Sequence, residues 1–209
     1  YDEILLGIQE GILSFNVESE AEVYRIEEIA SLQNKIVDVA IRFNPEVDSG
    51  GHEYIKTGRK GDKFGISSDD SVLKIANYIY ESKNLNLVGL ACHIGSQIMD
   101  LESYRLTAKN IKELSIKIKE IGNKLDFLDL GGGLGIPYEN DKTPSPQDLI
   151  SIIEAELMDV EERIVLEPGR SISGNAGVLL TKVEYIKDNF LIADAAMNDL
   201  LRPALYKAK

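Results

Sequence analysis

Residues 128–136 read Leu-Asp-Leu-Gly-Gly-Gly-Leu-Gly-Ile, an apolar run that leads into three consecutive glycines. Glycine has no Cβ, so the backbone N–H groups of such a turn can close around an anion. A glycine-rich turn directly after a strand is a candidate phosphate cradle, and α/β barrels commonly form one after their last strands. A tight turn without a ligand is the alternative, because glycine marks turns in every fold.

The composition excludes several classes of function. The 209 residues are 44% hydrophobic, enough to bury the core of one domain, or most of one domain with part of another. With 23 Lys and Arg against 35 Asp and Glu, the formal charge of -12 argues against nucleic acid and anionic membranes as partners. No apolar run reaches the roughly 18 residues of a membrane span, and the first residues do not resemble a signal peptide. We expect a cytoplasmic protein.

Cysteine and histidine are scarce, which limits metal chemistry. The single cysteine, Cys92, excludes an intramolecular disulfide and a multi-cysteine metal site, and it fits a reducing compartment. We expect Cys92 to be a small buried hydrophobic residue and predict no metal site. Of the two histidines, His52 lies in a polar loop and is given no role.

Apolar runs alternate with helical patterns along the first 170 residues. Strands are predicted at 13–17, 36–43, 85–91, 125–130 and 163–166. Helices are predicted over 2–10, after the caps Ser19, Ser68 and Ser145, and between 104 and 121. Asn84 and Gly122 are the expected stops of the helix after Ser68 and of the helix at 104–121, and Pro146 and Asp148 support the start after Ser145. Polar residues gather where these strands end. This arrangement is typical of a parallel sheet in an α/β barrel or a doubly wound fold.

The pattern changes after Arg170. Two strands at 178–185 and 190–194 follow without a helix between them, which predicts a second, β-rich domain. We therefore divide the chain into an α/β unit at 1–173 and the start of a β-domain at 174–209. The chain opens on Tyr1 without a methionine and ends without a closing element, so we expect an internal piece of a longer protein.

Three motifs at consecutive strand ends resemble those of one enzyme family, the barrel-type (fold III) pyridoxal phosphate decarboxylases. They are His-Ile-Gly-Ser-Gln at 93–97, Asp-Leu-Gly-Gly-Gly-Leu-Gly at 129–135 and Glu-Pro-Gly-Arg at 167–170. Further segments are similar to the diaminopimelate decarboxylase branch. They are Thr57-Gly58, Lys-Phe-Gly-Ile at 63–66, Gly-Asn-Ala-Gly at 174–177 and Met-Asn-Asp-Leu-Leu-Arg-Pro-Ala-Leu-Tyr at 197–206.

The resemblance implies a fold, an activity and an assembly. The fold would be a TIM-type (β/α)8 barrel followed by a β-domain, of which this chain would hold about strands 4–8, as a pyridoxal 5'-phosphate-binding part, and the entry to the second domain. The activity would be decarboxylation of meso-2,6-diaminopimelate to L-lysine and CO2, the last step of lysine biosynthesis. A homodimer with shared active sites is implied too.

In that family, the lysine that binds the cofactor lies upstream of the position of Tyr1. No lysine of this chain is assigned that role, and Lys56, Lys60 and Lys63 are interpreted as solvated charges in a polar loop. Five strands of an eight-stranded barrel would leave two sheet edges open, which favours association. We expect the 209 residues alone to be inactive and prone to aggregate.

The resemblance also assigns roles at the cofactor. Backbone groups of Gly131, Gly132, Gly133 and Gly169, next to Pro168, would hold the phosphate, and Ser96 would add a hydroxyl donor. Glu167 would keep the ring nitrogen of the cofactor protonated, and His93 would stack on the ring. The alternatives are a turn serine, an isolated glutamate at a buried strand end and a core histidine bonded to a carbonyl.

Three residues would recognise the amino-acid substrate. Arg170, which would also contact the cofactor, Arg202 and Tyr206 are the candidates, because an arginine fork matches carboxylate geometry. Surface salt bridges are the alternative role for the arginines. For the whole protein, a related decarboxylase of ornithine or arginine, or a non-catalytic barrel that binds phosphate or pyridoxal phosphate, remain alternatives.

Overall fold

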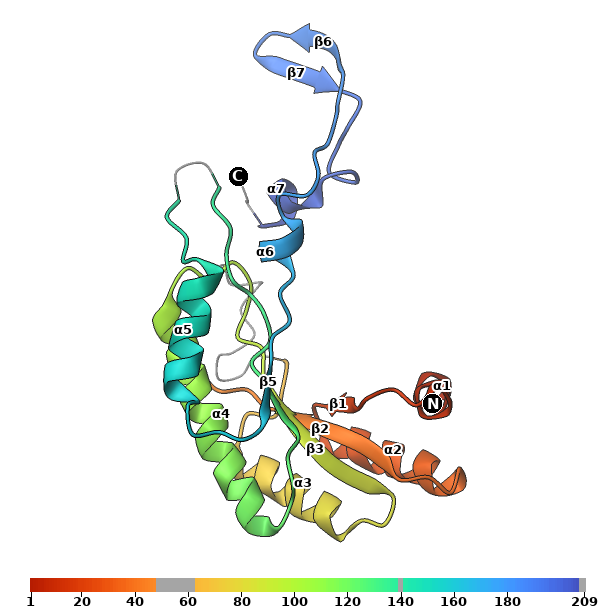
Figure 1. Cartoon of the computed structure of the whole chain (residues 1–209). Helices are drawn as coiled ribbons and strands as arrows, with labels where there is room; N and C mark the ends of the chain where they lie inside the picture. Colours follow the sequence, from red (N-terminus) through yellow and green to blue (C-terminus); the bar gives the residue numbers. More distant parts are fainter. Residues whose placement is uncertain (48–62, 139–140, 207–209) are drawn as a thin grey trace.

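The structure is a computed structural model that describes residues 1–47, 63–138 and 141–206 (Figure 1). Its centre is a five-stranded parallel sheet in the order β1-β2-β3-β4-β5. The strands are β1 (Phe15–Val17), β2 (Val37–Arg42), β3 (Leu85–Ala91), β4 (Phe127–Asp129) and β5 (Arg163–Val165). The helices before and between them are α1 (Asp2–Glu10), α2 (Glu20–Leu32), α3 (Asp69–Glu81), α4 (Leu101–Ile121) and α5 (Pro146–Glu156).

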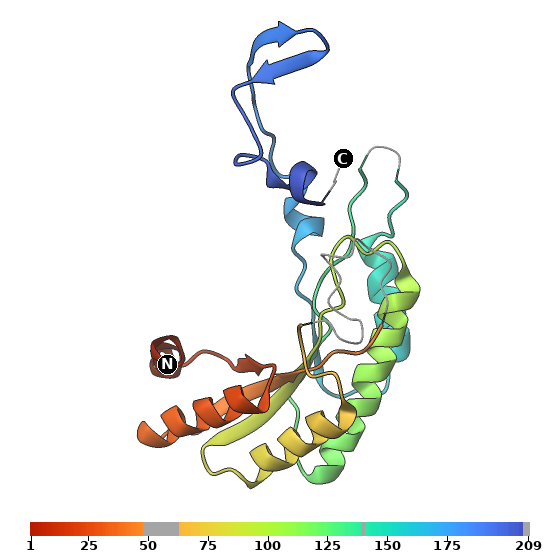
Figure 2. The same cartoon turned by 180° about the vertical axis from the view of Figure 1, so that it is seen from behind.

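The strand order decides between the two predicted architectures. Each strand pairs with the next one in the sequence, so the sheet advances in one direction without the reversal that defines a doubly wound fold. Helices α2 to α5 lie on the same side of the curved sheet in both views (Figures 1 and 2). Sequential parallel strands with helices on the outside are the arrangement of an α/β barrel wall.

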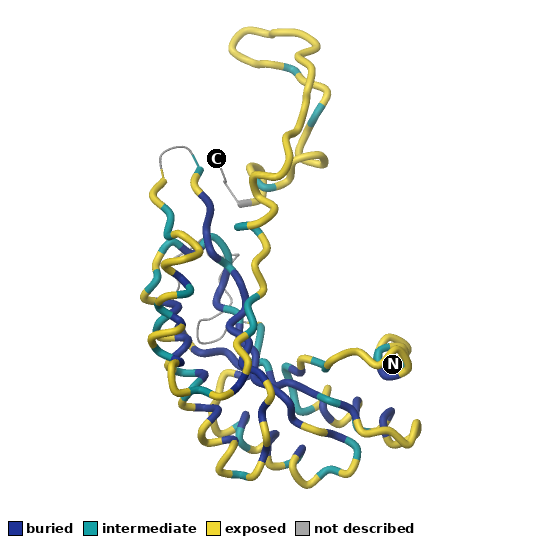
Figure 3. The backbone as a smooth tube through the Cα atoms, in the orientation of Figure 1, coloured by how far each residue is buried: buried dark blue, intermediate teal, exposed yellow. Residues whose placement is uncertain are grey.

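The two faces of the sheet are packed differently. On the helix side, a large apolar cluster joins the sheet to α2, α3 and α4, with Ile29, Ile41 and Leu90 completely buried. The other face carries a small cluster of Ala40, Val88 and Phe127. Figure 3 shows burial concentrated along the sheet and the inward sides of its helices. The helix-covered face therefore supplies most of the apolar burial that stabilises this half of the chain.

The predicted helix signals are confirmed. Ser19, Ser68 and Ser145 each accept a hydrogen bond from a backbone N–H in the first turn, and Ser145 forms a reciprocal capping box with Asp148. Helix α4 ends at Gly122, whose φ of 114° lies in the left-handed region. These caps set where the connections between helices and strands begin.

Several element boundaries differ from the predictions. β1 begins at Phe15 rather than at Leu13, whose side chain is exposed. Helix α3 ends at Glu81 rather than near Asn84, because Ser82 leaves the helical conformation and its hydroxyl accepts the N–H groups of Asn84 and Leu85. Residues 48–62, which make up most of the polar loop predicted at 46–65, lie outside the described residues, and with them His52, Lys56, Thr57, Gly58 and Lys60.

The last part of the chain forms a separate hairpin. Helix α6 (Arg170–Ser173) is followed by β6 (Val183–Lys187), β7 (Phe190–Ala193) and α7 (Leu201–Tyr206), and β6 pairs with β7 antiparallel. The prediction of a strand from residue 178 was wrong. Asp194 instead holds this segment, accepting the Thr181 hydroxyl and the Lys182 N–H at 2.9 Å each. The domain boundary at 174 stays a prediction.

Among the described residues, no helix combines the length and the apolar character that crossing a membrane requires.

Candidate active site

A cavity of about 240 Å³ opens where the carboxyl ends of the five parallel strands meet. Each strand contributes a residue from its end or from the segment that follows it. The lining residues of this strand-end cavity are Asn16, Arg42, Ala91, Cys92, His93, Asp129 and Glu167. Because parallel strands bring their carboxyl ends to one edge of the sheet, residues far apart in the sequence become neighbours here.

The glycine loop, residues 131–135, follows β4 and leaves no room for side chains. Gly131 and Gly133 have left-handed backbones, with φ of 68° and 101°. A Cβ on either of them or on Gly132 would lie within 2.5 Å of a backbone oxygen of a neighbouring segment. At Gly132 the distance would be 2.0 Å, to the carbonyl of Glu167. The tight packing of this turn by itself requires glycine at all three positions.

Hydrogen bonds hold the glycine loop on two sides. The Glu167 N–H donates to the Gly131 carbonyl at 2.8 Å, which ties the loop to the segment after β5. The buried Tyr104 hydroxyl donates to the Gly132 carbonyl at 3.0 Å, which ties it to α4. The first two glycines are therefore fixed by the sheet and by the helix behind it.

His93 lies two residues after the end of β3, half-buried in the cavity wall. Its Nδ1 accepts the N–H of Gly132 at 3.2 Å. Burial, together with the positive charge of Arg42, lowers the pKa of His93, while the charge of Glu167 opposes this shift. A neutral ring that accepts at Nδ1 carries its proton on Nε2. His93 thus has a fixed orientation and a defined tautomer.

Asp129 and Glu167 form a carboxyl pair at the ends of β4 and β5. Asp129 is buried, and its Oδ1 accepts the Gly131 N–H at 2.8 Å. Burial and the neighbouring Glu167 raise the pKa of Asp129 to about 6, against the opposing effects of the Gly131 hydrogen bond and of Arg42. The cavity is therefore lined by two acidic side chains, Asp129 and Glu167, and one cation, Arg42, and this acidic excess favours a cationic partner.

The expectation that Glu167 is buried is wrong, because its side chain is exposed. It follows β5, which is the edge strand of this sheet, so no further strand covers it. The buried carboxyl group at this edge belongs instead to Asp129.

Arg42 links the cavity to the neighbouring loops. Its guanidinium donates to Glu18 Oε1 at 2.6 Å and lies 5.1 Å from the centroid of the Phe64 ring. Glu18 Oε2 also accepts the Gly65 N–H at 2.9 Å. This network joins the ends of β1 and β2 to the segment around residue 65.

Sequence reasoning missed Asn16, Arg42 and Asp129 as cavity residues. The available signal was their position, because each lies at or near the carboxyl end of a predicted strand. The prediction for Cys92 is confirmed, since it is buried and its Sγ donates to the Asp129 carbonyl at 3.5 Å. Burial raises the pKa of this thiol, which keeps it protonated.

Ser96 and Arg170 meet beside the glycine loop. Arg170 Nη2 donates to the Ser96 hydroxyl at 2.9 Å, and Nη1 donates to Gln97 Oε1 at 3.0 Å. Pro168 lines a separate, mostly apolar cavity of about 310 Å³ that Gly131 and Gly132 also border. Gly169 is exposed, and a Cβ there would meet nothing within 4 Å.

The two remaining predicted residues lie on α7. This helix lies beside α6, which begins at Arg170, in both views (Figures 1 and 2). Arg202 is partly buried, and Tyr206 ends the helix with a side chain outside the described part of the structure. Across 1–47, 63–138 and 141–206, no three His, Cys, Asp or Glu side chains cluster as metal ligands.

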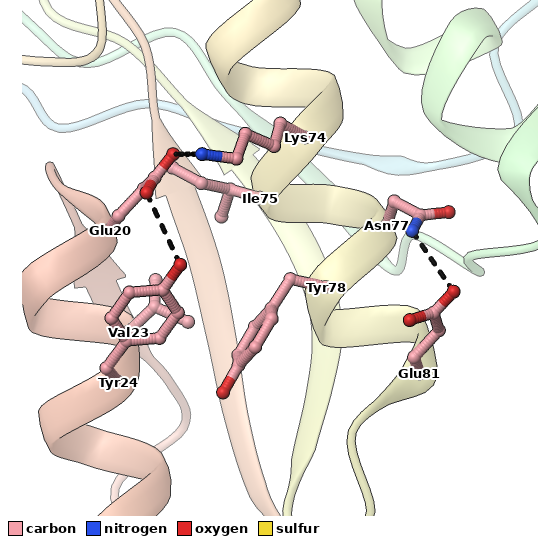
Figure 4. Close-up of a pocket in the computed structure, with 8 residues that line it drawn as sticks. All are labelled: Glu20, Val23, Tyr24, Lys74, Ile75, Asn77, Tyr78 and Glu81. Atoms are coloured by element: carbon pink, nitrogen blue, oxygen red, sulfur yellow. Dashed lines mark hydrogen bonds and ion pairs between the residues drawn. The ribbon is translucent and has the colours of Figure 1, made fainter.

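A second hollow lies on the outside of the sheet, between α2 and α3 (Figure 4). Its polar side chains pair with one another: Glu20 accepts from Lys74 at 2.7 Å and from the Tyr24 hydroxyl at 3.3 Å. Tyr78 packs edge-on against Tyr24, with ring centroids 4.8 Å apart. We call it the outer groove, and its contacts are those of a packed helix pair.

The chain matches known proteins along nearly its whole length. A diaminopimelate decarboxylase from Aquifex aeolicus is 44% identical over 99% of this chain, and one from Haemophilus influenzae is 42% identical over 99%. The crystal structure of a diaminopimelate decarboxylase from Helicobacter pylori complexed with L-lysine is 39% identical, covers 100% of this chain and 53% of its own, and superimposes with a TM-score of 0.97.

An arginine decarboxylase from Paramecium bursaria Chlorella virus is 22% identical over 81% of this chain and 43% of its own, with a TM-score of 0.65. That likeness shows the fold alone. The chain spans about half the length of the curated relatives it matches. A family model described as "Pyridoxal-dependent decarboxylase, pyridoxal binding domain" matches residues 2–174. The chain therefore belongs to the family of pyridoxal-dependent decarboxylases.

Proposed function

We propose that this chain forms the cofactor-binding part of an enzyme that decarboxylates meso-2,6-diaminopimelate to L-lysine and CO2. The observation that carries the proposal is that His93, Asp129 and Glu167 face one cavity beside the glycine loop. The similarity of the whole chain to diaminopimelate decarboxylases, one of them complexed with L-lysine, supports the choice of substrate.

The residues present fit the phosphate of pyridoxal 5'-phosphate. The N–H groups of Gly131 and Gly132 already donate to Asp129 Oδ1 and His93 Nδ1, so these two glycines shape the loop. The backbone of Gly133, which has no side chain, would contact the phosphate. The Arg170 guanidinium and the Ser96 hydroxyl, which already contact each other beside this turn, supply a charge and a hydroxyl donor. Gly169 adds an open backbone position before α6.

The strand-end cavity fits the ring of the cofactor. When bound, pyridoxal phosphate accepts the electron pair that remains as CO2 departs. Glu167 holds a proton on the ring nitrogen, and the acidic character of the Asp129 and Glu167 pair favours the cationic ring. His93, fixed by Gly132, presents a neutral imidazole that positions the ring.

We assign substrate recognition to Arg170, which also borders the cofactor phosphate, and to Arg202 and Tyr206 on α7. Diaminopimelate has two carboxylates, and the one that is not lost needs a cationic partner. Replacing Arg202 with alanine should raise KM for diaminopimelate about tenfold, which corresponds to one charge-assisted contact, and leave cofactor retention unchanged. Replacing the exposed Arg25 on α2 provides the control. If the Arg202 variant lost affinity for the substrate and for the cofactor to the same extent, this role would be contradicted.

The native gene product tests the function directly. After loading with pyridoxal phosphate and reduction with borohydride, peptide mass spectrometry should find one cofactor adduct on a lysine upstream of Tyr1. Product analysis should then find lysine and CO2 from meso-diaminopimelate and negligible CO2 from ornithine or arginine. Faster turnover of ornithine or arginine would show that one of these, and not diaminopimelate, is the substrate. A gene product that takes up no cofactor would favour a non-catalytic barrel.

The proposal extends to assembly and location. Apolar side chains of the β6–β7 hairpin such as Tyr185, Ile186 and Phe190 are more than half exposed, which supports association with further protein surface. We propose a homodimer with shared active sites in the cytoplasm, and expect the 209 residues alone to be inactive. Light scattering on the native gene product tests the homodimer. Activity assays on the native gene product and on the isolated chain test whether the 209 residues alone are inactive.

A further inference from the structure

Gln97 connects three loops that follow different strands. Its Oε1 accepts hydrogen bonds from Arg170 Nη1 at 3.0 Å and from the Ile136 N–H at 3.2 Å. Its Nε2 donates to the Ile136 carbonyl at 2.6 Å. One side-chain amide therefore joins the loop after β3 to the end of the glycine loop and to the start of α6.

The backbone of Gln97 is unusual and is held in place by its surroundings. Its φ of 59° lies in the left-handed region, which a residue with a Cβ rarely adopts. The next residue, Ile98, donates its N–H to the Gly133 carbonyl at 2.9 Å and accepts the Gly135 N–H at 3.0 Å. The conformation places the Gln97 side chain and the Ile98 backbone against the same loop at once.

We propose that Gln97 is a positioning residue, which locks Arg170 and the glycine loop together as a preformed anion cradle. Arg170 donates one arm of its fork to Gln97 and the other to Ser96, so the orientation of its guanidinium is fixed before any ligand binds. The inference rests on the proposed function for the identity of the anion, the phosphate of pyridoxal phosphate.

Only an amide satisfies all three contacts. A glutamate at 97 would still accept from Arg170 but would lose the donor to the Ile136 carbonyl and add a negative charge beside the cradle. A methionine would keep a similar volume and lose every hydrogen bond. Gln97→Met and Gln97→Glu are thus complementary variants. Gln147→Met, at an exposed position of α5, is the matched control.

The test measures the dissociation constants of pyridoxal 5'-phosphate and of pyridoxal, which lacks the phosphate, with the native gene product. Both Gln97 variants should bind pyridoxal phosphate about tenfold or more weakly and pyridoxal within about threefold of wild type, because only the anion contact is disturbed. Equal weakening of both ligands, or unchanged binding of pyridoxal phosphate by either variant, would overturn the proposal.

Hydrogen exchange of the cofactor-free protein supplies an independent readout. In Gln97→Met, amides of the peptide that includes Ile136 and of the peptide around Arg170 should exchange about tenfold faster, while those of α2 stay unchanged. Unchanged exchange in both peptides would overturn the proposal. A wild-type protein that binds no pyridoxal phosphate would instead contradict the proposed function, and the exchange experiment would still decide the role of Gln97.

Discussion

The strand-end cavity and the outer groove are similar in size, about 240 and 190 Å³, but differ in how their polar groups are held. In the outer groove, Lys74 and Glu20 satisfy each other at the surface (Figure 4). In the cavity, Asp129 and Glu167 have like charge, and backbone hydrogen bonds of the glycine loop keep them together. A hollow with self-paired charges stabilises helix packing, whereas one with unbalanced charges is suited to a ligand.

The largest expected effect comes from breaking the backbone that shapes the cavity. In Gly132→Ala the new Cβ would meet the Glu167 carbonyl at 2.0 Å, so the loop or the segment after β5 must move. We expect a loss of about 3 kcal/mol or more in the free energy of unfolding. Urea denaturation measures this effect.

Gly169→Ala is the matched control, because a Cβ at 169 meets nothing within 4 Å. It should change the free energy of unfolding by no more than about 1 kcal/mol, the scale of a helix N-cap substitution. Similar losses in both variants would contradict the distinction drawn between the two glycines.

The next effect is on turnover. Glu167→Gln should leave cofactor binding largely intact and lower kcat about 100-fold or more, equivalent to about 2.7 kcal/mol, because the amide cannot hold the ring nitrogen protonated. Glu20→Gln in the outer groove removes an exposed ion pair and should leave kcat within twofold. Steady-state kinetics of the native gene product compare the two. A Glu167 variant within threefold of wild type would contradict the role.

Burial of Asp129 beside Glu167 predicts a pH dependence of stability. The pKa of Asp129 is raised to about 6 in the folded protein, above its ordinary value of 3.8, so the folded state binds more protons than the unfolded state between these values. The contribution of Asp129 to the free energy of unfolding is therefore present at low pH and is lost as the pH rises through about 6. Asp129→Asn keeps an oxygen for the Gly131 N–H and removes the titration.

The stability of Asp129→Asn relative to wild type should therefore increase by about 2 kcal/mol between pH 4.5 and pH 7.5. Urea denaturation at both pH values measures the difference. Asp38→Asn, on β2 outside the cavity, is the control and should show no comparable change. A constant difference for the Asp129 variant would mean that burial and Glu167 do not raise its pKa.

Local signals predicted much of the fold. Ser145 with Pro146 and Asp148 marked the start of α5, and Gly122 marked the end of α4, because caps depend on a few adjacent residues. The strands were also found, and β3 has its predicted bounds. Other ends, such as the start of β1, were not predicted, since a strand ends where its neighbour ceases to pair. The pairing register, such as Asp129 with Val165, depends on the whole sheet and has no local signal.

The candidate site could be predicted only in part, for the same reason. His93 and Glu167 lie in recognisable motifs, and the structure brings them to one cavity. Asp129 was quoted within a motif but given no role, because its raised pKa comes from burial and from Glu167 after the neighbouring strand, neither of which is visible in the local sequence. Gln97 was also quoted within a motif without a role, since a left-handed glutamine arises from contacts with residues about 40 and 70 positions away.

The smallest expected effect comes from a substitution in the outer groove, which tests whether this groove is independent of the strand-end cavity. The Tyr78 hydroxyl donates to Glu27, and this bond together with burial raises the pKa of Tyr78 to about 12. Tyr78→Phe removes one hydrogen bond but leaves Glu27 with a second donor, the hydroxyl of Ser82. We expect a loss of about 1 kcal/mol in the free energy of unfolding.

Because the outer groove lies on the helix side of the sheet, the same variant should leave kcat and the affinity for pyridoxal phosphate within twofold of wild type. Urea denaturation and steady-state kinetics on one preparation measure both quantities. Tyr80→Phe, at an exposed position of the same helix, controls for the loss of a hydroxyl. A drop in kcat without a drop in stability would show that the two hollows are coupled through β2 and β3, and that charge pairing alone does not separate a structural groove from a functional cavity.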